Sequence, residues 1–317
     1  MSRLTRRHWM QTALLGSAGV AMAVGAQPQP PRRVVFLAGP KSHGFGEHAH
    51  VAGCRLLADR LNRVPGLEAV VVEERWPEDP GIIERADALV FYCDGDERHL
   101  LNGHEDLLRA RPGLGIGFLH YATVPPAGLG FDLMLDRTGG VFEQHWSVNP
   151  FWTADYRSFR LHPATRGVRP FVIEDEWYYH MRFTGESGPG FTPLLVALPP
   201  DATLRRPDGP YSNNPTARRA VLEQREPQIM AWVAEGLGGG RGFGFTGGHY
   251  HWNWAHPDFR LLVLNAIAWL AGVNVPESGL ADAPPAWDEL MTPLGPPPAD
   301  FDADELRGRI AAWNDAR

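Results

Sequence analysis

Two glycines, two histidines and two tryptophans crowd into one short segment, residues 247–254, which reads GGHYHWNW. Imidazole rings supply acid–base chemistry or metal ligation, and indole rings supply flat apolar walls with one N–H donor. This composition predicts one wall of a small-molecule site. We expect His249 to point inward, His251 to share its face if the segment stays extended, and Trp252 and Trp254 to shape the pocket. The alternative is a turn before a core element whose histidines are merely packed and hydrogen-bonded.

Three further segments carry side chains of the same kinds. The Gly-rich loop SHGFGEHAH, residues 42–50, lacks the GK[ST] ending of a P-loop and the GxGxxG pattern of a dinucleotide site. FLHYAT, residues 118–123, places His120 where hydrolytic α/β folds hold a nucleophile on a strained turn. EDEWYYHMRF, residues 174–183, sets the carboxylate of Glu176 beside aromatic rings, a common way to hold a sugar. Packed or solvated side chains are the alternative interpretation for each segment.

The first half of the chain predicts the framework that positions these segments. Apolar runs typical of buried parallel strands alternate with helical patterns at the spacing of βαβ units. The expected strands are 32–40, 67–74, 86–96 and 114–124, and the expected helices are 49–63, a short one within 77–85, and 104–112. Ligands bind at the C-terminal strand ends of such open sheets. SHGFGEH, CDGDERH and HYAT all follow strands in this way.

The second half is less regular until its end. Strands are expected at 192–200, 227–235 and 240–248, with a Pro/Asn/Arg loop at 201–219. The most strongly patterned helix covers 256–273, and a tail helix is expected within 300–315 after a Pro-rich stretch. We expect one α/β domain over 27–276 with a C-terminal extension, 277–317.

The N-terminus predicts export. Arg6 and Arg7 form a twin-arginine pair, and the apolar stretch after them is too short to span a bilayer. The small residues Val24-Gly25-Ala26 fit a signal-peptidase site, so residues 1–26 read as a cleaved signal and the mature protein as periplasmic or extracellular. The formal net charge of −7 argues against nucleic acid and anionic membranes as partners.

Thiol chemistry finds little support in the sequence. The two cysteines, Cys54 and Cys93, form no CxxC pair, so cysteine-based zinc binding is not indicated. An exported protein could join them in a disulfide, but a chain of this length can also bury two free thiols. No GxSxG motif occurs, which disfavours a serine hydrolase.

Four segments in this order resemble the ThuA-like (trehalose-utilisation) family over roughly residues 33–276. They are SHGFGEHAHVAGCRLLADRL, FLHYAT, DEWYYHMRF and GRGFGFTGGHYHWNWAHPDFRLLVLNAIAWLAG. The resemblance implies a class I glutamine amidotransferase-like fold, which is a flavodoxin-like three-layer α/β sandwich with a mostly parallel sheet. Amidotransferases of this fold carry Gly-x-Cys-x-Gly at the elbow, where this chain has Phe118, His120 and Ala122. Glutaminase chemistry through a thiolate is therefore not expected.

The resemblance also implies which side chains line the pocket. His43, His120, Glu176 and His249 are the expected catalytic residues. Side chains expected to contact the substrate are Ser42, Glu47, His48, Tyr121, Tyr178, His251 and Trp252. The His-rich pocket would suit a divalent metal such as zinc, with His43, His120 and His249 as candidate ligands, although no HExxH motif is present.

We therefore expect an exported enzyme that processes a small-molecule carbohydrate, with the family pointing to 3-oxo-glycosides. An oxo group acidifies the neighbouring C–H, a His or Glu takes that proton, and a metal or imidazole stabilises the enolate. Isomerisation, elimination and hydrolysis would all begin this way. The alternatives are a non-catalytic sugar-binding module on the same fold and amidotransferase-like hydrolysis through Cys93. Homo-oligomerisation is left open.

Overall fold

The computed structural model of the protein describes residues 30–126, 128, 130–185, 190–236 and 239–316. The chain forms one compact unit from Pro31 onward, and this unit includes the C-terminal extension. The expected export signal, residues 1–26, lies outside the described residues. Among the residues described, no helix combines the length and apolar character that crossing a membrane requires.

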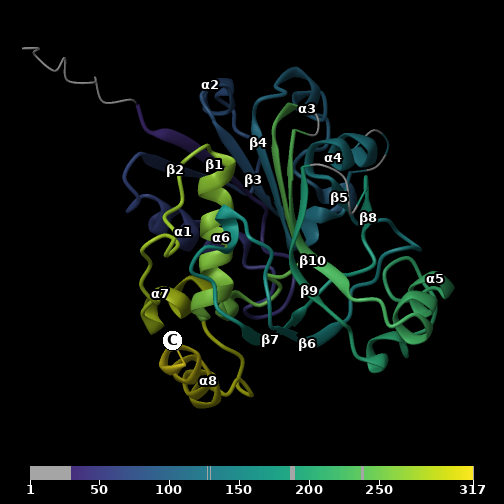
Figure 1. The fold of residues 1–317 in the computed structure, drawn as a ribbon. Helices are drawn as coiled ribbons and strands as arrows, with labels where there is room; N and C mark the ends of the chain where they lie inside the picture. The colour runs from purple at the N-terminus through teal and green to yellow at the C-terminus, as the bar shows by residue number, and fades with distance from the viewer. Residues whose placement is uncertain (1–29, 127, 129, 186–189, 237–238, 317) are drawn as a thin grey trace, which may run out of the picture. The chain divides into compact units, whose positions relative to one another are not determined.

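A seven-stranded sheet forms the centre of the unit, in the order β2-β1-β3-β4-β11-β10-β9 (Figure 1). The strands are β1 (Arg32–Ala38), β2 (Leu67–Glu73), β3 (Ala88–Tyr92), β4 (Gly115–Leu119), β9 (Phe191–Ala197), β10 (Gln228–Glu235) and β11 (Arg241–Phe245). Strands β2, β1, β3, β4 and β11 pair in parallel, and β10 pairs antiparallel with both β11 and β9. The expected mostly parallel α/β sheet is confirmed.

Helices cover both faces of the sheet, because its central strands are apolar on both sides. Val34 and Phe36 of β1 belong to the core under α1 (His50–Leu61) and α6 (Pro257–Leu270). Val35 and Leu37 face the opposite core, which includes residues of α2 (Pro80–Glu84), α3 (Leu107–Ala110) and α4 (Gly130–Thr138). These three layers make a flavodoxin-like sandwich.

Two smaller antiparallel pairs extend the structure beyond the main sheet. They are β6 (Phe151–Tyr156) with β7 (Phe171–Glu176), and β5 (Gly140–Val141) with β8 (Arg182–Phe183). Short helical turns connect the strands. They are η1 (Asp96–Arg98), η2 (His120–Thr123), η3 (Pro163–Thr165), η4 (Asp201–Leu204), α5 (Pro215–Arg218), the π-helix η5 (Arg219–Glu223) and η7 (His251–Ala255). The segment 201–219, expected as a loop, therefore contains two helical turns.

Several expected elements are shorter in the structure. The helix expected over 104–112 is reduced to α3, because residues 99–107 form successive hydrogen-bonded turns around the buried Leu101. The strands expected over 86–96 and 114–124 end at Tyr92 and Leu119. After Tyr92 and after Leu119 the chain leaves the sheet and forms loops that carry polar side chains.

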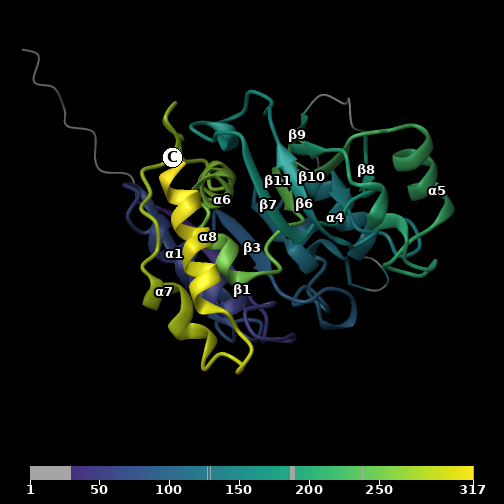
Figure 2. The ribbon, with the colours of Figure 1, turned by 90° about the horizontal axis from the view of Figure 1, so that it is seen from below.

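The C-terminal extension folds back onto the domain. It contains α7 (Trp287–Met291), η8 (Thr292–Leu294) and α8 (Ala303–Asp315), and the last of these is the expected tail helix. In Figure 1, α8 lies below the lower end of α6, and it is in front of α1 and α6 when the molecule is viewed from below in Figure 2. Trp313 of α8 contacts His256, the residue before α6, at 5.2 Å between ring centroids. Arg60 of α1 holds α7 through two hydrogen bonds to the Glu289 carboxylate, at 2.6 and 2.8 Å.

Candidate functional site

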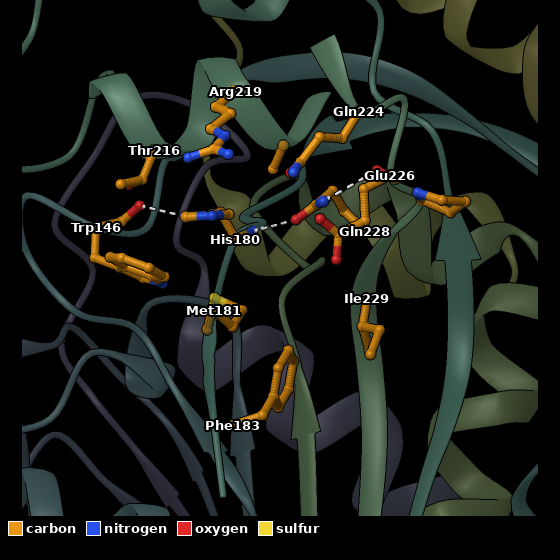
Figure 3. Close-up of a pocket in the computed structure, with 12 residues that line it drawn as sticks. Trp146, His180, Met181, Phe183, Thr216, Arg219, Gln224, Glu226, Gln228 and Ile229 are labelled. Atoms are coloured by element: carbon orange, nitrogen blue, oxygen red, sulfur yellow. Dashed lines mark hydrogen bonds between the residues drawn. The ribbon is translucent and has the colours of Figure 1, made fainter. Parts of the chain in front are cut away.

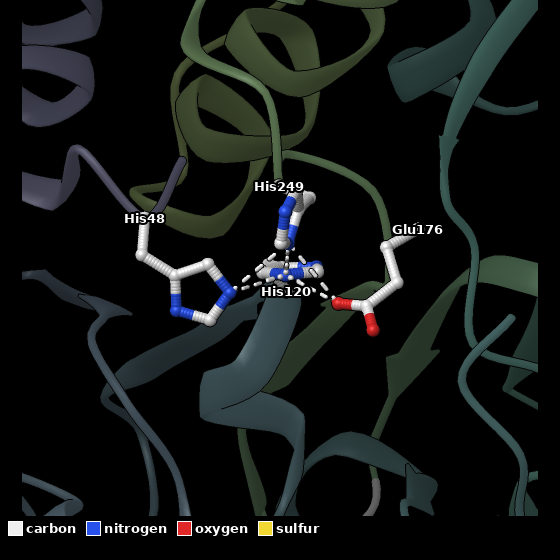
Figure 4. A group of neighbouring side chains, drawn as sticks. All are labelled: His48, His120, Glu176 and His249. Atoms are coloured by element: carbon white, nitrogen blue, oxygen red, sulfur yellow. Dashed lines mark hydrogen bonds and ion pairs between the residues drawn. The ribbon is translucent and has the colours of Figure 1, made fainter. Parts of the chain in front are cut away.

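Four buried polar side chains converge at the C-terminal edge of the sheet (Figure 4). His48 follows β1, His120 follows β4, Glu176 ends β7, and His249 follows β11. Because β1, β4 and β11 run parallel, their C-terminal ends meet at one edge. One nitrogen or oxygen from each side chain lies within 4.8 Å of the other three. We call these four residues the His/Glu cluster.

Five of the six distances between donor atoms in the cluster are close to the edges of a tetrahedral donor set, while His48 and Glu176 lie further apart, within 4.8 Å. His48 Nε2 lies 3.1 Å from His120 Nε2 and 3.1 Å from His249 Nδ1, and the last two atoms are 3.3 Å apart. Glu176 Oε2 lies 3.1 Å from His249 Nδ1 and 3.4 Å from His120 Nε2. A tetrahedron with metal–nitrogen bonds of about 2.0–2.1 Å has edges of about 3.3–3.4 Å. The residues present thus fit a divalent ion of zinc's size.

Hydrogen bonds behind the cluster fix which ring nitrogens carry protons. His48 Nδ1 lies 2.9 Å from Asp94 Oδ1, and His120 Nδ1 lies 2.9 Å from the Thr246 carbonyl oxygen. Both partners are acceptors, so each Nδ1 is the donor and each neutral ring presents a lone pair at Nε2. These two lone pairs face each other beside the Glu176 carboxylate. Such an arrangement is repulsive unless a cation or a proton lies among the donor atoms.

The electrostatics keep the acids ionised and His48 neutral. Burial lowers the pKa of His48. Burial alone would raise the pKa of Asp94, but hydrogen bonds from His48 and Ser42 outweigh it and lower that pKa. At Glu176, burial is likewise outweighed by His120 and His249 when those rings carry a second proton, and the pKa falls to about 2. For His249, burial is outweighed by the hydrogen bond to Glu176, which raises its pKa.

Two cluster histidines have backbone conformations that side-chain-bearing residues seldom adopt. The φ angle is 42° at His48 and 54° at His120, both in the left-handed region. The backbone N–H of His48 donates to the His249 carbonyl, at 3.0 Å. The Thr123 hydroxyl donates to the His120 carbonyl, at 2.6 Å. Unfavourable φ angles of this kind cluster at functional sites, where the surrounding structure holds them in place.

A buried carboxylate on β7 anchors the loop that carries His249. Asp175 is fully buried, and its Oδ1 accepts from the backbone N–H groups of Glu176 and His249 at 2.8 and 3.0 Å. Its Oδ2 accepts from the Gly248 N–H at 2.7 Å and from Asn253 Nδ2 at 3.1 Å. Asp175 therefore fixes the backbone at the start of this loop and the side chain of Asn253 near its end.

Three partly exposed rings mark where the cluster reaches the surface. Phe151 is 47% exposed, and its ring meets His249 edge-on at 4.9 Å between centroids. His43 is exposed and lies against the His48 ring at 3.7 Å, while Tyr121 lies 5.8 Å from the same ring. The exposed face of the Phe151 ring can pack against the apolar face of a ligand.

Of the expected catalytic residues, the structure brings His120, Glu176 and His249 together. The fourth member is His48, which was expected to contact substrate, whereas His43 lies outside the cluster. The Tyr178 hydroxyl lies 3.3 Å from both His120 Nε2 and Glu176 Oε2. Ser42, Glu47 and Tyr121 also lie beside the cluster: the Ser42 hydroxyl donates to Asp94 at 2.7 Å, and Glu47 Oε1 is 3.8 Å from His249 Nε2.

The segment 247–254 does not stay extended. The 3-10 helix η7 begins at His251, so this side chain does not share the face of His249 and is not a member of the cluster. Trp252 stacks on Tyr250 at 4.9 Å, on the outer side of the loop. Trp254 is fully buried in the core and does not shape a pocket wall.

Three residues that build the site were not singled out from the sequence. Asp94 lies in the CDGDERH segment, where its position after a strand was the available signal. Asp175 precedes Glu176 in the segment 174–183, but its role as a backbone anchor depends on the fold. Phe151 is one aromatic residue in an alternating strand, and nothing in the sequence distinguishes it.

The cysteines do not take part in the cluster. Cys54 and Cys93 are both free and fully buried. Burial raises the pKa of the Cys93 thiol to about 12, so the reactive thiolate is strongly disfavoured. This environment does not support nucleophilic chemistry through Cys93.

A separate pocket of about 480 Å³ lies away from the cluster (Figure 3). His180 Nδ1 donates to the Trp146 carbonyl at 2.9 Å, and the His180 N–H donates to Gln228 Oε1 at 3.1 Å. Gln228 Nε2 in turn donates to the Glu226 carbonyl. Because these polar groups satisfy one another, the pocket offers less chemistry than the His/Glu cluster does.

Comparisons with known proteins agree with the motifs and the fold. A crystal structure of a putative ThuA-like protein from Bacteroides uniformis matches with a TM-score of 0.52 and 15% identity, over 78% of this chain and 96% of that chain. A second putative ThuA-like protein, from Parabacteroides merdae, matches with a TM-score of 0.49 and 16% identity, over 78% and 92%. No curated protein matches. The family model ThuA, described as trehalose utilisation, covers residues 40–270, so the chain belongs to the ThuA family.

Proposed function

We propose that this chain is a carbohydrate-processing enzyme whose His/Glu cluster binds a divalent metal ion of the zinc type. The observation that carries the proposal is the distance of 3.1 Å between Nε2 of His48 and Nε2 of His120, beside the Glu176 carboxylate, when an acceptor lies behind Nδ1 of each ring. Three imidazoles and one carboxylate are a donor set that suits zinc. Asp94 and the Thr246 carbonyl orient the two rings from behind, as acceptors behind metal-bound histidines do.

The residues around the cluster suggest how it would act. A bound divalent ion would polarise an oxo or hydroxyl oxygen of the substrate. The Tyr178 hydroxyl, held between His120 and Glu176, can donate to an oxygen in the cluster. Glu47 reaches solvent beside His249 and can take a proton from a substrate carbon or oxygen. Phe151 would hold the apolar face of a sugar ring.

The substrate class rests on the family's description and on the exposed Phe151. The finer proposal is a 3-oxo-glycoside, whose oxo group acidifies the neighbouring C–H that a base must remove. Isomerisation, elimination and hydrolysis share this first step. Export by the twin-arginine pathway to the periplasm or beyond is proposed from residues 1–26, and thiol-based amidotransferase chemistry is not proposed.

Metal analysis of the purified full chain tests the proposed centre. We expect about one equivalent of zinc or a related divalent ion, and a marked loss in His48→Ala and in Glu176→Gln. His104→Ala is the matched control, because His104 stacks on Trp76 and is not a member of the cluster. Wild-type protein that holds no metal and shows no thermal stabilisation on addition of Zn²⁺ would refute the centre.

Turnover of oxo-sugars tests the proposed activity. Purified protein should convert 3-oxo-trehalose or a related 3-oxo-glycoside in the presence of Zn²⁺, and His120→Ala should abolish that conversion. Binding of these sugars without any turnover would instead identify a sugar-binding module. If the protein neither binds nor converts any of these oxo-sugars, the proposed substrate class is wrong.

The role of Phe151 can be separated from the metal. Phe151→Ala should raise KM by roughly two- to tenfold and leave kcat little changed, because a stacking contact of about 0.5–1.5 kcal/mol is lost. Val172→Ala is the control, since Val172 is 51% exposed on the neighbouring strand β7. An unchanged KM in Phe151→Ala, measured beside that control, would remove Phe151 from the substrate site.

A further inference from the structure

The C-terminal tail touches the two loops that carry His48 and His249. Phe301, just before α8, meets the ring of Phe45 edge-on at 4.9 Å between centroids. The ring of Phe301 also lies 5.9 Å from the ring of Trp252, between centroids. Phe45 belongs to the loop 42–50 after β1, and Trp252 to the loop 247–255 after β11. Phe301 thus contacts both loops, although it lies outside the residues that the family model matches.

The two loops are joined directly by backbone hydrogen bonds. The His48 N–H donates to the His249 carbonyl at 3.0 Å, and the His251 N–H donates to the Gly46 carbonyl at 2.7 Å. Glu47 and Tyr250 form an isolated antiparallel bridge between them. A displacement of either loop would therefore disturb the other, and with it the spacing of His48 and His249.

Trp252 packs closely on the first loop. A Cβ atom added at Gly46 would lie 2.1 Å from the Trp252 ring, so only glycine fits beneath it. Gly46 also has a φ of +75°, a conformation that glycine adopts without strain. Phe301 covers this contact from outside, where Trp252 and Phe45 are both only partly buried.

A continuous series of ring contacts links Phe301 to His249. Trp252 stacks on Tyr250 at 4.9 Å with an interplanar angle of 14°. Tyr250 in turn meets His249 edge-on at 4.9 Å. Each ring in this series contacts the next, so removing Phe301 takes away the outermost contact of the series.

We propose that Phe301 is a positioning residue, which braces the two loops through Phe45 and Trp252 and so keeps His48 and His249 at their observed spacing. The tail in this view completes a site that the ThuA domain carries. The effect of Phe301 on loop order is independent of any metal. Its effect on metal affinity rests on the function proposed above.

Hydrogen–deuterium exchange of the full chain, without added metal, tests the proposal. In Phe301→Ala, amides of residues 44–50 and 249–253 should exchange about tenfold faster, because two aromatic contacts are lost. Phe301→Tyr, which keeps the ring, should restore wild-type exchange. Trp313→Ala is the matched control: Trp313 lies on α8 and contacts His256 rather than Phe45 or Trp252. Unchanged loop exchange in Phe301→Ala, or an equal rise in Trp313→Ala, would overturn the proposal.

Zinc titration of the same variants separates this inference from the metal proposal. Phe301→Ala should bind Zn²⁺ about tenfold more weakly than wild type, and Trp313→Ala should bind it normally. If wild-type protein binds no zinc, the metal proposal fails, and loop exchange alone still decides the role of Phe301. If wild type binds zinc while Phe301→Ala matches it in both affinity and loop exchange, only the role of Phe301 fails.

Discussion

Asp94 determines which ring nitrogen of His48 carries the proton, so the lone pair of His48 lies on Nε2 and points into the cluster. Its carboxylate accepts the Nδ1–H at 2.9 Å and is itself held by the Ser42 hydroxyl. In Asp94→Asn, the amide can donate to Nδ1, which would move the ring proton to Nε2 and into the cluster. We expect zinc affinity to fall roughly 10- to 100-fold, as for other losses of a carboxylate behind a metal-bound histidine.

Competition with a chromophoric chelator would measure this change. Glu97→Gln is the control, because Glu97 is an exposed acid in the same loop and its replacement removes the same charge. Equal affinities in Asp94→Asn and Glu97→Gln would show that Asp94 contributes only its charge or nothing at all.

At the scale of residues, the sequence predicted that several of these side chains lie together but could not place every one. His120 and His249 follow parallel strands, and the meeting of strand ends in an α/β sheet was enough to bring them together. Glu176 ends a strand of the separate β6–β7 pair. The choice between His43 and His48 depended on backbone turns. Gly46 and His48 adopt left-handed backbone conformations, and the imidazole of His48 lies in the cluster. The short loop between His43 and His48 has no periodic sequence pattern from which these conformations could be predicted.

The carboxylate of Asp175 joins strand β7 to the loop after β11 through hydrogen bonds. Asp175→Asn keeps the shape of the side chain but replaces one acceptor oxygen with a donor, which would face a backbone N–H. We expect a loss of about 3 kcal/mol in unfolding free energy, since hydrogen bonds to a buried charge are lost and a buried donor is left unpaired. Urea unfolding of the metal-free protein would measure it.

Glu174→Gln is the control for this change, because Glu174 lies next to Asp175 in sequence but its side chain is exposed. The same unfolding free energy in both variants would mean that the loop does not depend on the Asp175 carboxylate.

The main elements were easier to predict than the small ones. Continuous apolar runs identified β1, β3, β4 and β10, and the helical pattern of 256–273 identified α6. The pair β6 and β7, which supplies Phe151 and Glu176, forms between segments separated by an irregular loop. Its pairing depends on contacts distant in sequence, which local patterns do not report.

For the molecule as a whole, a buried neutral histidine, His99, makes the unfolding free energy depend on pH. His99 is 2% exposed and lies against the rings of Phe91 and Phe118. Burial lowers its pKa from 6.5 to about 4, partly offset by its hydrogen bond to the Ala122 carbonyl. Its other nitrogen accepts from the Leu101 N–H, so protonation would also break that bond. Between pH 4 and 6.5 the unfolded chain therefore binds a proton that the folded chain does not.

The sign of the effect follows from this difference in bound protons. The contribution of neutral His99 to the unfolding free energy is fully present above pH 6.5. It declines as the pH falls and is lost by about pH 4, a total change of about 3 kcal/mol. His99→Gln removes this titration, so its unfolding free energy should fall less between pH 7 and 5 than that of wild type. Urea unfolding at both pH values measures the difference, and NMR should show the wild-type imidazole neutral down to about pH 4. Equal pH dependence in the two proteins, or an imidazole that titrates near 6.5, would contradict the prediction.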